Sequence, residues 1–243
     1  VPKEFAHHTL TVPFNDIDSV QRVIEAHSDQ IACLILEPIA GNMGVIPPKD
    51  GYLEELRKVT AEYGIVLIFD ECTSGFRETN GGLHLKYGIK PDMCILGKAL
   101  GNGYSITAVL GKKSIMDNAQ STFISSTFWT DRIGPTAALK TLEVMERIKS
   151  WEIISEIGNR IKSQWLDLGN SYDLPLDVFG PPALIKFTIN SNNMRAYKTL
   201  ITQEMLKKGF LASNMVYVCV DHTKNIIKKY FKHLDKIFYM ISE

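Results

Sequence analysis

Short apolar runs alternate with amphipathic stretches along the first half of the chain. Residues 31–37 and 65–70 are continuous apolar runs that each end on an acid, and the first is as expected for a strand buried on both faces of a sheet. Between them, residues 51–63 carry leucine and valine at helical spacing. A strand, a helix and a second strand in this order predict a parallel crossover unit.

The same periodicities continue the α/β pattern to about residue 150. A third strand is expected over residues 91–98, with Cys94 buried in it as Cys33 is in the first strand. A further strand is expected over 106–110. Helices are predicted at 16–28, 114–118 and 133–148.

From Trp151 the order of elements changes to α+β. Helices are predicted at 151–168, 194–208 and 224–241, and strands at 184–189 and 216–220. The last helix has a continuous apolar face. We therefore expect a mostly parallel large domain over residues 1–149 and a C-terminal α+β small domain over residues 150–243.

Charge and composition exclude several classes of function. The chain has 243 residues, with 27 basic and 27 acidic side chains, so no net charge favours nucleic acid or an anionic membrane. No apolar run approaches the roughly 20 residues of a membrane span. The four cysteines have no metal-ligand spacing, and they indicate a reducing, cytoplasmic compartment. No metal site is predicted.

Two strand ends carry the candidate chemistry. Asp70 ends the second apolar run, and Lys98 follows the third. Ligands of open α/β sheets bind at the carboxyl ends of the strands. An acid can hold a cofactor ring nitrogen protonated, and a partly buried lysine amine can bond covalently to an aldehyde. Either residue alone is more often structural, so the prediction depends on their combination.

Beyond this pair, the sequence resembles the class III aminotransferases of the fold-type I pyridoxal phosphate enzymes, in particular glutamate-1-semialdehyde 2,1-aminomutase and its relatives. The resemblance runs over almost the whole chain. It is carried by Glu37-Pro38 with Gly41-Asn42-Met43-Gly44, Gly51-Tyr52-Leu53, Phe69-Asp70-Glu71 with Gly75-Phe76-Arg77, Gly81-Gly82, Tyr87-Gly88, Pro91-Asp92, Leu96-Gly97-Lys98, Gly101, Gly103, Ser126-Thr127-Phe128 and His222-Thr223.

The resemblance implies a role for each matching residue. Lys98 would bond to the aldehyde of pyridoxal 5'-phosphate and later move the substrate proton, and Asp70 would pair with the ring nitrogen. Cys72 stands where the family usually has valine or isoleucine under the ring. Thr127 would bind the cofactor phosphate across the interface of a homodimer with shared active sites. Glu37 would lie near the substrate, although a cap or an ion pair is an equal alternative.

The resemblance also leaves the reaction open. It implies amino transfer between an amine or amino acid and a carbonyl compound. The alternatives are an intramolecular aminomutase, a decarboxylation or racemisation, or a noncatalytic fragment that needs a missing N-terminal segment. The family's phosphate cradle and ring-stacking aromatic would lie upstream of Val1. The segments 101–105 and 127–132 depart from the family pattern near the substrate pocket.

Overall fold

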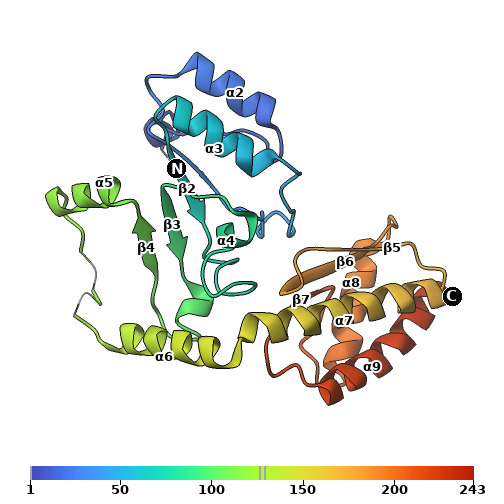
Figure 1. The fold of residues 1–243 in the computed structure, drawn as a ribbon. Helices are drawn as coiled ribbons and strands as arrows, with labels where there is room; N and C mark the ends of the chain where they lie inside the picture. Colours follow the sequence, from blue (N-terminus) through green and yellow to red (C-terminus); the bar gives the residue numbers. More distant parts are fainter. Residues whose placement is uncertain (1, 126, 129) are drawn as a thin grey trace. The chain divides into compact units, whose positions relative to one another are not determined.

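The computed structural model describes residues 2–125, 127–128 and 130–243 (Figure 1). By its internal contacts the chain divides into two compact units, each described here by itself. Unit 1 comprises Val1–Gly41 and Pro47–Leu142, and unit 2 comprises Asn42–Ile46 and Glu143–Glu243. The domain boundary expected near residue 150 stays a prediction about independent folding.

Unit 1 contains a four-stranded sheet in the order β1-β2-β3-β4. The first three strands are parallel, and β4 runs antiparallel to β3. The elements are α1 (Lys3–Ala6), α2 (Ile17–Ala26), β1 (Cys33–Leu36), α3 (Tyr52–Glu62), β2 (Val66–Asp70), α4 (His84–Tyr87), β3 (Met93–Leu96), η1 (Lys98–Leu100), β4 (Ala108–Gly111), α5 (Lys113–Met116), η2 (Asp117–Ser121) and the first part of α6 (Ile133–Ile148).

The core of unit 1 lies between the sheet and the helices α2 and α3. Helix α2 begins where the sequence predicts it, because the Asp16 carboxylate accepts a hydrogen bond from the Ser19 N–H at 3.0 Å and caps the first turn. The inward faces of both helices meet alternate residues of the strands. The buried members are Val20, Ile24, Tyr52, Leu53, Leu56, Val59, Ile65, Leu67, Phe69 and Ile89.

The prediction that the first strand is buried on both faces is wrong. Among the described residues, β1 lies at the edge of the sheet and pairs with β2 alone. Its alternate residues Leu34 and Leu36 pack on the core, whereas Cys33 is exposed and Ile35 is 57% exposed. An apolar run therefore predicted the strand correctly, but burial depends on what covers each face. Cys94, in the interior strand β3, is buried as expected.

Unit 2 is an antiparallel sheet packed against three helices. Strand β6 is central and pairs with β5 and β7. Strand β5 follows Pro175 and has no counterpart in the sequence prediction, because its run is short. The elements are the last part of α6, α7 (Ser150–Ser171), β5 (Leu176–Phe179), β6 (Leu184–Ile189), α8 (Met194–Leu206), β7 (Met215–Tyr217) and α9 (Lys224–Ser242).

The core of unit 2 is rich in aromatic side chains. Trp165 and Phe187 are fully buried, and their rings meet edge to face at 4.8 Å between centroids. The indole N–H of Trp165 donates to the Tyr230 hydroxyl at 3.0 Å, so this polar atom is satisfied in the interior. Among the described residues, no helix is both long and apolar enough to cross a membrane.

Candidate active site

The carboxyl ends of β2 and β3 bring the two predicted residues to one edge of the sheet. Asp70 is the last residue of β2 and pairs in register with Ile95 of β3. Lys98 follows two residues after β3 ends. Because these strands are parallel neighbours, both side chains leave from the same edge of the sheet. The backbone N–H of Cys72 donates to Oδ1 of Asp70 at 3.0 Å, which fixes one carboxylate oxygen in the turn after β2.

Lys98 has an unusual backbone conformation. Its φ is +42°, in the left-handed region that non-glycine residues seldom occupy. Its carbonyl oxygen accepts from the N–H groups of Gly101 and Asn102, both at 3.2 Å, so the following turn holds this conformation. Residues kept in such regions cluster at functional sites. The residue as a whole is exposed, while the hydrogen bond made by its amine is partly buried.

The Lys98 amine is held by a residue that the sequence analysis did not single out. Nζ donates to Oγ1 of Thr73 at 2.6 Å, across the gap between the turns that follow β2 and β3. Thr73 is 8% exposed. Its carbonyl oxygen accepts a hydrogen bond from Nε of Arg77. The hydroxyl of a buried threonine therefore meets the amine of an exposed lysine at the strand ends.

Cys72 lies among the charged groups of this edge. Burial raises the pKa of the Cys72 thiol, and the negative charge of Asp70 raises it further, whereas the positive charge of Lys98 lowers it. The carboxylate of Glu37 also raises this pKa. The thiol is therefore within electrostatic reach of three predicted site residues. It remains a neutral, soft group at neutral pH.

Glu37 and Thr127 are placed differently from each other. Oε2 of Glu37 accepts from the Gly41 N–H at 2.8 Å and closes the turn after β1. Thr127 lies in an exposed turn, and no hydrogen bond of the described residues joins it to Lys98 or Asp70. Its motif neighbour Ser126, and Trp129 in the segment that departs from the family pattern, lie outside the described residues.

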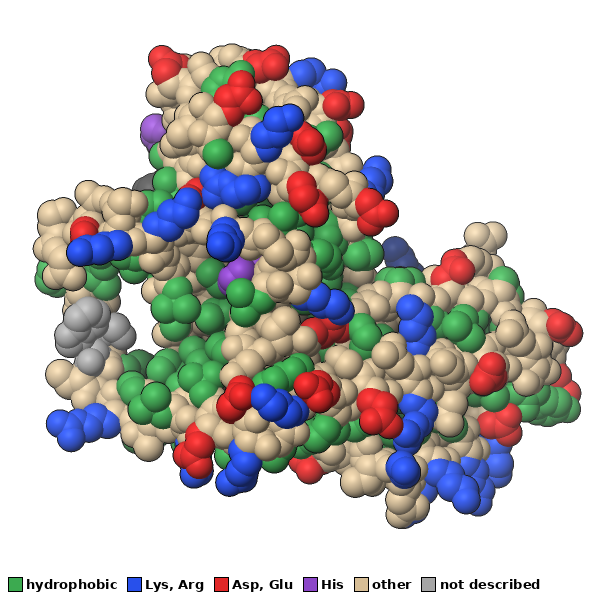
Figure 2. Space-filling view, in the orientation of Figure 1, with side chains coloured by type: hydrophobic (Ala, Val, Ile, Leu, Met, Phe, Trp, Pro, Cys, Tyr) green, Lys and Arg blue, Asp and Glu red, His purple; other side chains and the backbone are tan. Residues whose placement is uncertain are grey.

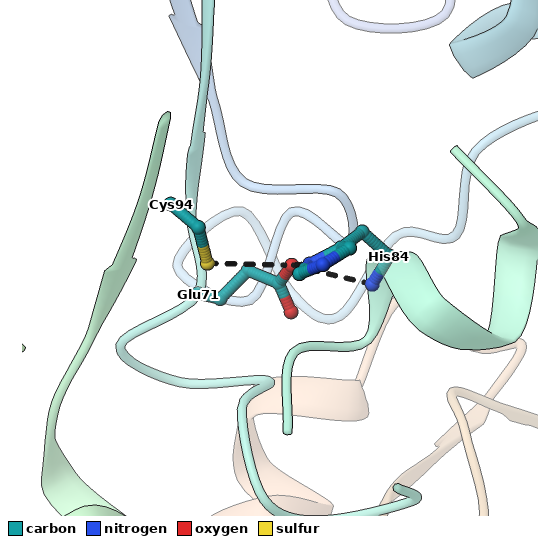
Figure 3. Close-up of side chains that lie close together, drawn as sticks. All are labelled: Glu71, His84 and Cys94. Atoms are coloured by element: carbon teal, nitrogen blue, oxygen red, sulfur yellow. Dashed lines mark hydrogen bonds and ion pairs between the residues drawn. The ribbon is translucent and has the colours of Figure 1, made fainter. Parts of the chain in front are cut away.

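A second cluster joins the residue after β2, the first residue of α4 and a residue of β3 (Figure 3). Glu71, His84 and Cys94 place their ligand atoms within 4.8 Å of one another. The Glu71 carboxylate is fully buried, and it accepts from the backbone N–H groups of Leu83 and His84. Nδ1 of His84 lies 2.5 Å from Oε1 of Glu71.

These contacts make Glu71 a clamp for the glycine loop at 81–84. Its oxygens already satisfy the loop N–H groups, and a side chain on Gly82 would come within 2.7 Å of Oε1. Burial raises the pKa of the Cys94 thiol to about 12, with Glu71 adding to the rise, so the thiolate form that a metal requires is disfavoured. The cluster is therefore better explained as structural than as a metal site.

A cavity of about 780 Å³ lies beside β3 and β4 in unit 1. Neither Asp70 nor Lys98 lines it. Its walls come from the segment between β2 and β3, from both strands and from α6, and they include Phe76, His84, Cys94, Leu96, Leu110 and Leu142. The cavity therefore does not mark the strand-end site.

Sequence reasoning missed Thr73 and Glu71 for the same reason. Both lie in the segment after β2, which was used to identify the family. Chemical roles were predicted there for Asp70 and Cys72 but not for Glu71 or Thr73. The available signal was a run of polar residues directly after an apolar strand, since Asp70, Glu71, Thr73 and Ser74 are interrupted only by Cys72. Their partners, however, come from distant loops that the sequence alone does not bring together.

Comparison with known sequences gives a consistent result. The sequence family described as Aminotransferase class-III matches residues 5–238. Glutamate-1-semialdehyde 2,1-aminomutase of Methanococcus maripaludis is 33% identical over 253 residues, which cover 97% of this chain and 59% of the relative. The protein of that name from Hyperthermus butylicus is 32% identical over 255 residues, covering 98% and 60%. The chain thus spans about three fifths of these relatives' length.

Solved structures share the fold. An omega-transaminase from Sphaerobacter thermophilus matches with a TM-score of 0.90 at 22% identity, over 98% of this chain and 58% of the other. Acetylornithine aminotransferase from Elizabethkingia anophelis matches with a TM-score of 0.85 at 26% identity, over 94% and 62%. The predicted fold class, a mostly parallel sheet with an α+β unit, is confirmed.

Proposed function

Because the chain belongs to the class-III aminotransferase family, we propose that it forms the strand-end part of a pyridoxal 5'-phosphate site and takes part in amino transfer. The observation that carries this proposal is the placement of Asp70 and Lys98 at one edge of the parallel sheet. The chain spans only part of its relatives, so the activity of the whole protein is included in the proposal.

The residues at this edge fit the cofactor's donor and acceptor groups. The Asp70 carboxylate suits a protonated ring nitrogen. The amine of the exposed Lys98 can reach an aldehyde, and its one hydrogen bond among the described residues is to a neutral hydroxyl. The Cys72 thiol, which is neutral, suits the apolar face of a ring. Thr127 offers a hydroxyl for the phosphate group.

Each residue would then have a distinct task. Bound pyridoxal phosphate supplies an electron sink for the carbon that carries the amino group. Asp70 would keep the ring nitrogen charged, and Lys98 would bind the aldehyde and then carry the substrate proton. Glu37 would orient the turn at Gly41 beside the substrate. In the complete cycle the donor amine becomes a carbonyl, and the acceptor carbonyl becomes an amine.

The direct test is covalent capture of the cofactor. The chain is mixed with pyridoxal phosphate and reduced with borohydride, and peptide mass spectrometry locates the adduct. We expect the adduct on Lys98, together with a visible absorption band that is lost in Lys98→Ala. Lys113→Ala, a surface lysine of the same unit, is the matched control and keeps both signals. A band that survives in Lys98→Ala, or an adduct spread evenly over the lysines, would contradict the proposal.

Capture also tests the alternative of a noncatalytic fragment. If the chain captures no cofactor, the fragment alternative is correct. If it does, an amino donor alone should convert the bound cofactor to pyridoxamine phosphate, whereas decarboxylation or racemisation would leave it as the aldehyde.

The aminomutase alternative has its own test. The curated relatives carry the name glutamate-1-semialdehyde 2,1-aminomutase. An aminomutase acts on one carbon skeleton, so glutamate-1-semialdehyde alone should give an isomeric product. An aminotransferase requires a separate donor and acceptor. Incubation with the semialdehyde alone, followed by mass spectrometry and chromatography of the product, separates the two reactions.

We further propose a homodimer in the cytoplasm. Apolar side chains are gathered on the surface of unit 1 (Figure 2), and the exposed apolar residues on either side of Thr127 in the sequence include Phe123, 95% exposed, and Leu139, 70% exposed. Exposed apolar patches of this kind mark interaction surfaces. Sedimentation should show a dimer that Leu139→Glu weakens. The described cysteines are all free thiols, which suits a reducing compartment.

A further inference from the structure

Thr73 has a geometry that the proposed function does not yet use. Its side chain branches at Cβ, and the two branches face different partners. Oγ1 accepts from Nζ of Lys98 at 2.6 Å. The methyl group Cγ2 lies against Gly41, where an added Cβ would come within 3.4 Å of it. A single rotamer therefore fixes both contacts.

The rotamer is selected by packing. Threonine has few accessible χ1 states, so placing the methyl group also places the hydroxyl. Gly41 leaves room for that methyl group, and its own position is fixed by the hydrogen bond to Glu37 at 2.8 Å. A Cβ at Gly41 would lie 2.9 Å from Oε2 of Glu37. The turn after β1 thus sets the direction of a hydroxyl in the turn after β2.

The Lys98 amine depends on this hydroxyl more than on any other described group. Its only hydrogen bond among the described residues is the one to Thr73. The residue is exposed, so close packing on all sides does not hold the side chain in place. A long, exposed lysine without a partner samples many rotamers, which reduces the fraction of time it is aligned for attack.

We propose that Thr73 is a positioning residue for Lys98, held in its rotamer by the turn that Glu37 and Gly41 form. The inference rests on the proposed function, because the amine is positioned for the capture of an aldehyde. Thr73 itself need not touch the substrate. Its role is to increase the fraction of time for which the amine is aligned with the reacting carbon.

The first experiment needs no cofactor. In protein labelled with ¹⁵N at Nζ of lysine, the NMR signal of Lys98 is assigned by its loss in Lys98→Arg. A hydrogen-bonded ammonium group exchanges its protons with water more slowly than a free one. We expect Thr73→Val, which keeps the shape but removes the acceptor, to speed this exchange about threefold to tenfold, in line with the loss of one solvent-accessible hydrogen bond of ordinary strength.

Two variants make the comparison specific. Thr73→Ser keeps the hydroxyl but loses the methyl contact, so it should restore most of the slow exchange. Thr107→Val is the matched control: its methyl group lies close to Gly97 at the same strand ends, but its hydroxyl makes no bond to Lys98 in the described residues. If Thr73→Val folds poorly, Thr73→Ala removes the acceptor without adding volume. Equal exchange in wild type and the acceptor-free variant would overturn the proposal.

The second experiment measures capture of pyridoxal phosphate by stopped-flow absorbance. The maximal rate of the covalent step should fall about tenfold in Thr73→Val, while the half-saturating cofactor concentration stays within about twofold. Thr73→Ser should recover most of the rate. A change confined to the half-saturating concentration would assign Thr73 to binding and overturn the positioning role.

The two experiments separate the inference from the function on which it rests. If exchange responds to Thr73 but wild type captures no cofactor at Lys98, the proposed function fails and the positioning role fails with it, although the hydrogen bond is real. If wild type captures cofactor and the Thr73 variants capture it equally fast, only the inference fails. Slower capture and faster exchange together support both.

Discussion

The segment after β2 and the core of unit 2 use buried residues in opposite ways. In unit 2, large apolar rings fill the interior, and the one buried indole N–H finds the Tyr230 hydroxyl at 3.0 Å. In unit 1, the segment after β2 buries the Glu71 carboxylate and the Thr73 hydroxyl within three residues. It also contains Phe76 at a φ of +60°, and nearby Lys98 has a φ of +42°.

The two units differ in where features that lower stability lie in the fold. Buried polar groups and left-handed residues each lower stability unless their partners are fully supplied. Unit 2 also has the buried polar residues Ser150 and Asn214 and the buried, left-handed Val45, but its main apolar cluster contains none of them. In unit 1, buried polar groups and left-handed residues lie together at the strand ends, at the edge of the sheet where ligands of such folds bind. Substitutions should therefore act through packing in unit 2 and through polar partners in unit 1.

The largest effect should come from Trp165. Replacing this fully buried ring with alanine leaves a cavity and an unpaired Tyr230 hydroxyl, so we expect Trp165→Ala to lower the free energy of unfolding by about 3–5 kcal/mol. Hydrogen exchange should rise in β6 and stay unchanged in β2. Trp151→Ala, at the half-buried start of α7, is the control and should cost much less. Similar losses at both sites would mean that ring size alone, and not packing, decides the cost.

Glu71 should give the next largest effect. Glu71→Ala would leave the N–H groups of Leu83 and His84 without their acceptor, and we expect a loss of about 2–4 kcal/mol in the free energy of unfolding. Hydrogen exchange should localise this loss to the loop at 81–84. The exposed Glu55→Ala should change stability by less than about 0.5 kcal/mol. A Glu71 variant as stable as the Glu55 variant would remove the clamp role.

Asp92 should make unit 1 sensitive to acid. Burial alone would raise the pKa of its carboxyl, but hydrogen bonds from Lys112, the Leu67 N–H and Arg57 outweigh burial and hold the pKa below its usual value. The folded pKa lies below the unfolded one, so the stabilisation is complete above the unfolded value of about 3.9 and is lost as the pH falls through the folded pKa.

Asp92→Asn should therefore destabilise the chain by about 1–2 kcal/mol at neutral pH. The gap from wild type should narrow only as the pH falls below about 4. Denaturant unfolding at a series of pH values measures the gap. A gap that is constant down to the lowest pH would show that the loss comes from packing and not from charge.

The smallest effect should come from the backbone of Lys98. Glycine accepts a positive φ without strain, so Lys98→Gly should be about 1 kcal/mol more stable than Lys98→Ala. At Lys113, within α5, the same pair of substitutions should have the opposite order, because glycine is a poor helix former. If alanine is the better residue at both positions, the left-handed conformation at Lys98 is not strained.

Periodicity predicted most elements of both units, since helices such as 133–148 and the strand 184–189 have long, regular patterns. It failed at β5, which is too short to show a period, and at the burial of β1, which depends on neighbours and not on the run itself. Asp70 and Lys98 could be chosen because strand ends follow from the pattern. Thr73 could not, because its partners Lys98 and Gly41 are distant in sequence and meet only in the fold.

The short segment Asn42–Ile46 belongs to unit 2 although the residues on both sides of it belong to unit 1. Val45 in this segment is fully buried, and a side chain on Gly180 would reach to within 2.9 Å of its Cγ1. Unit 2 is therefore formed by two separate segments of the sequence. A chimera that exchanges residues 143–243 between relatives must also exchange residues 42–46. Otherwise the buried Val45 segment would come from one protein and the rest of unit 2 from the other.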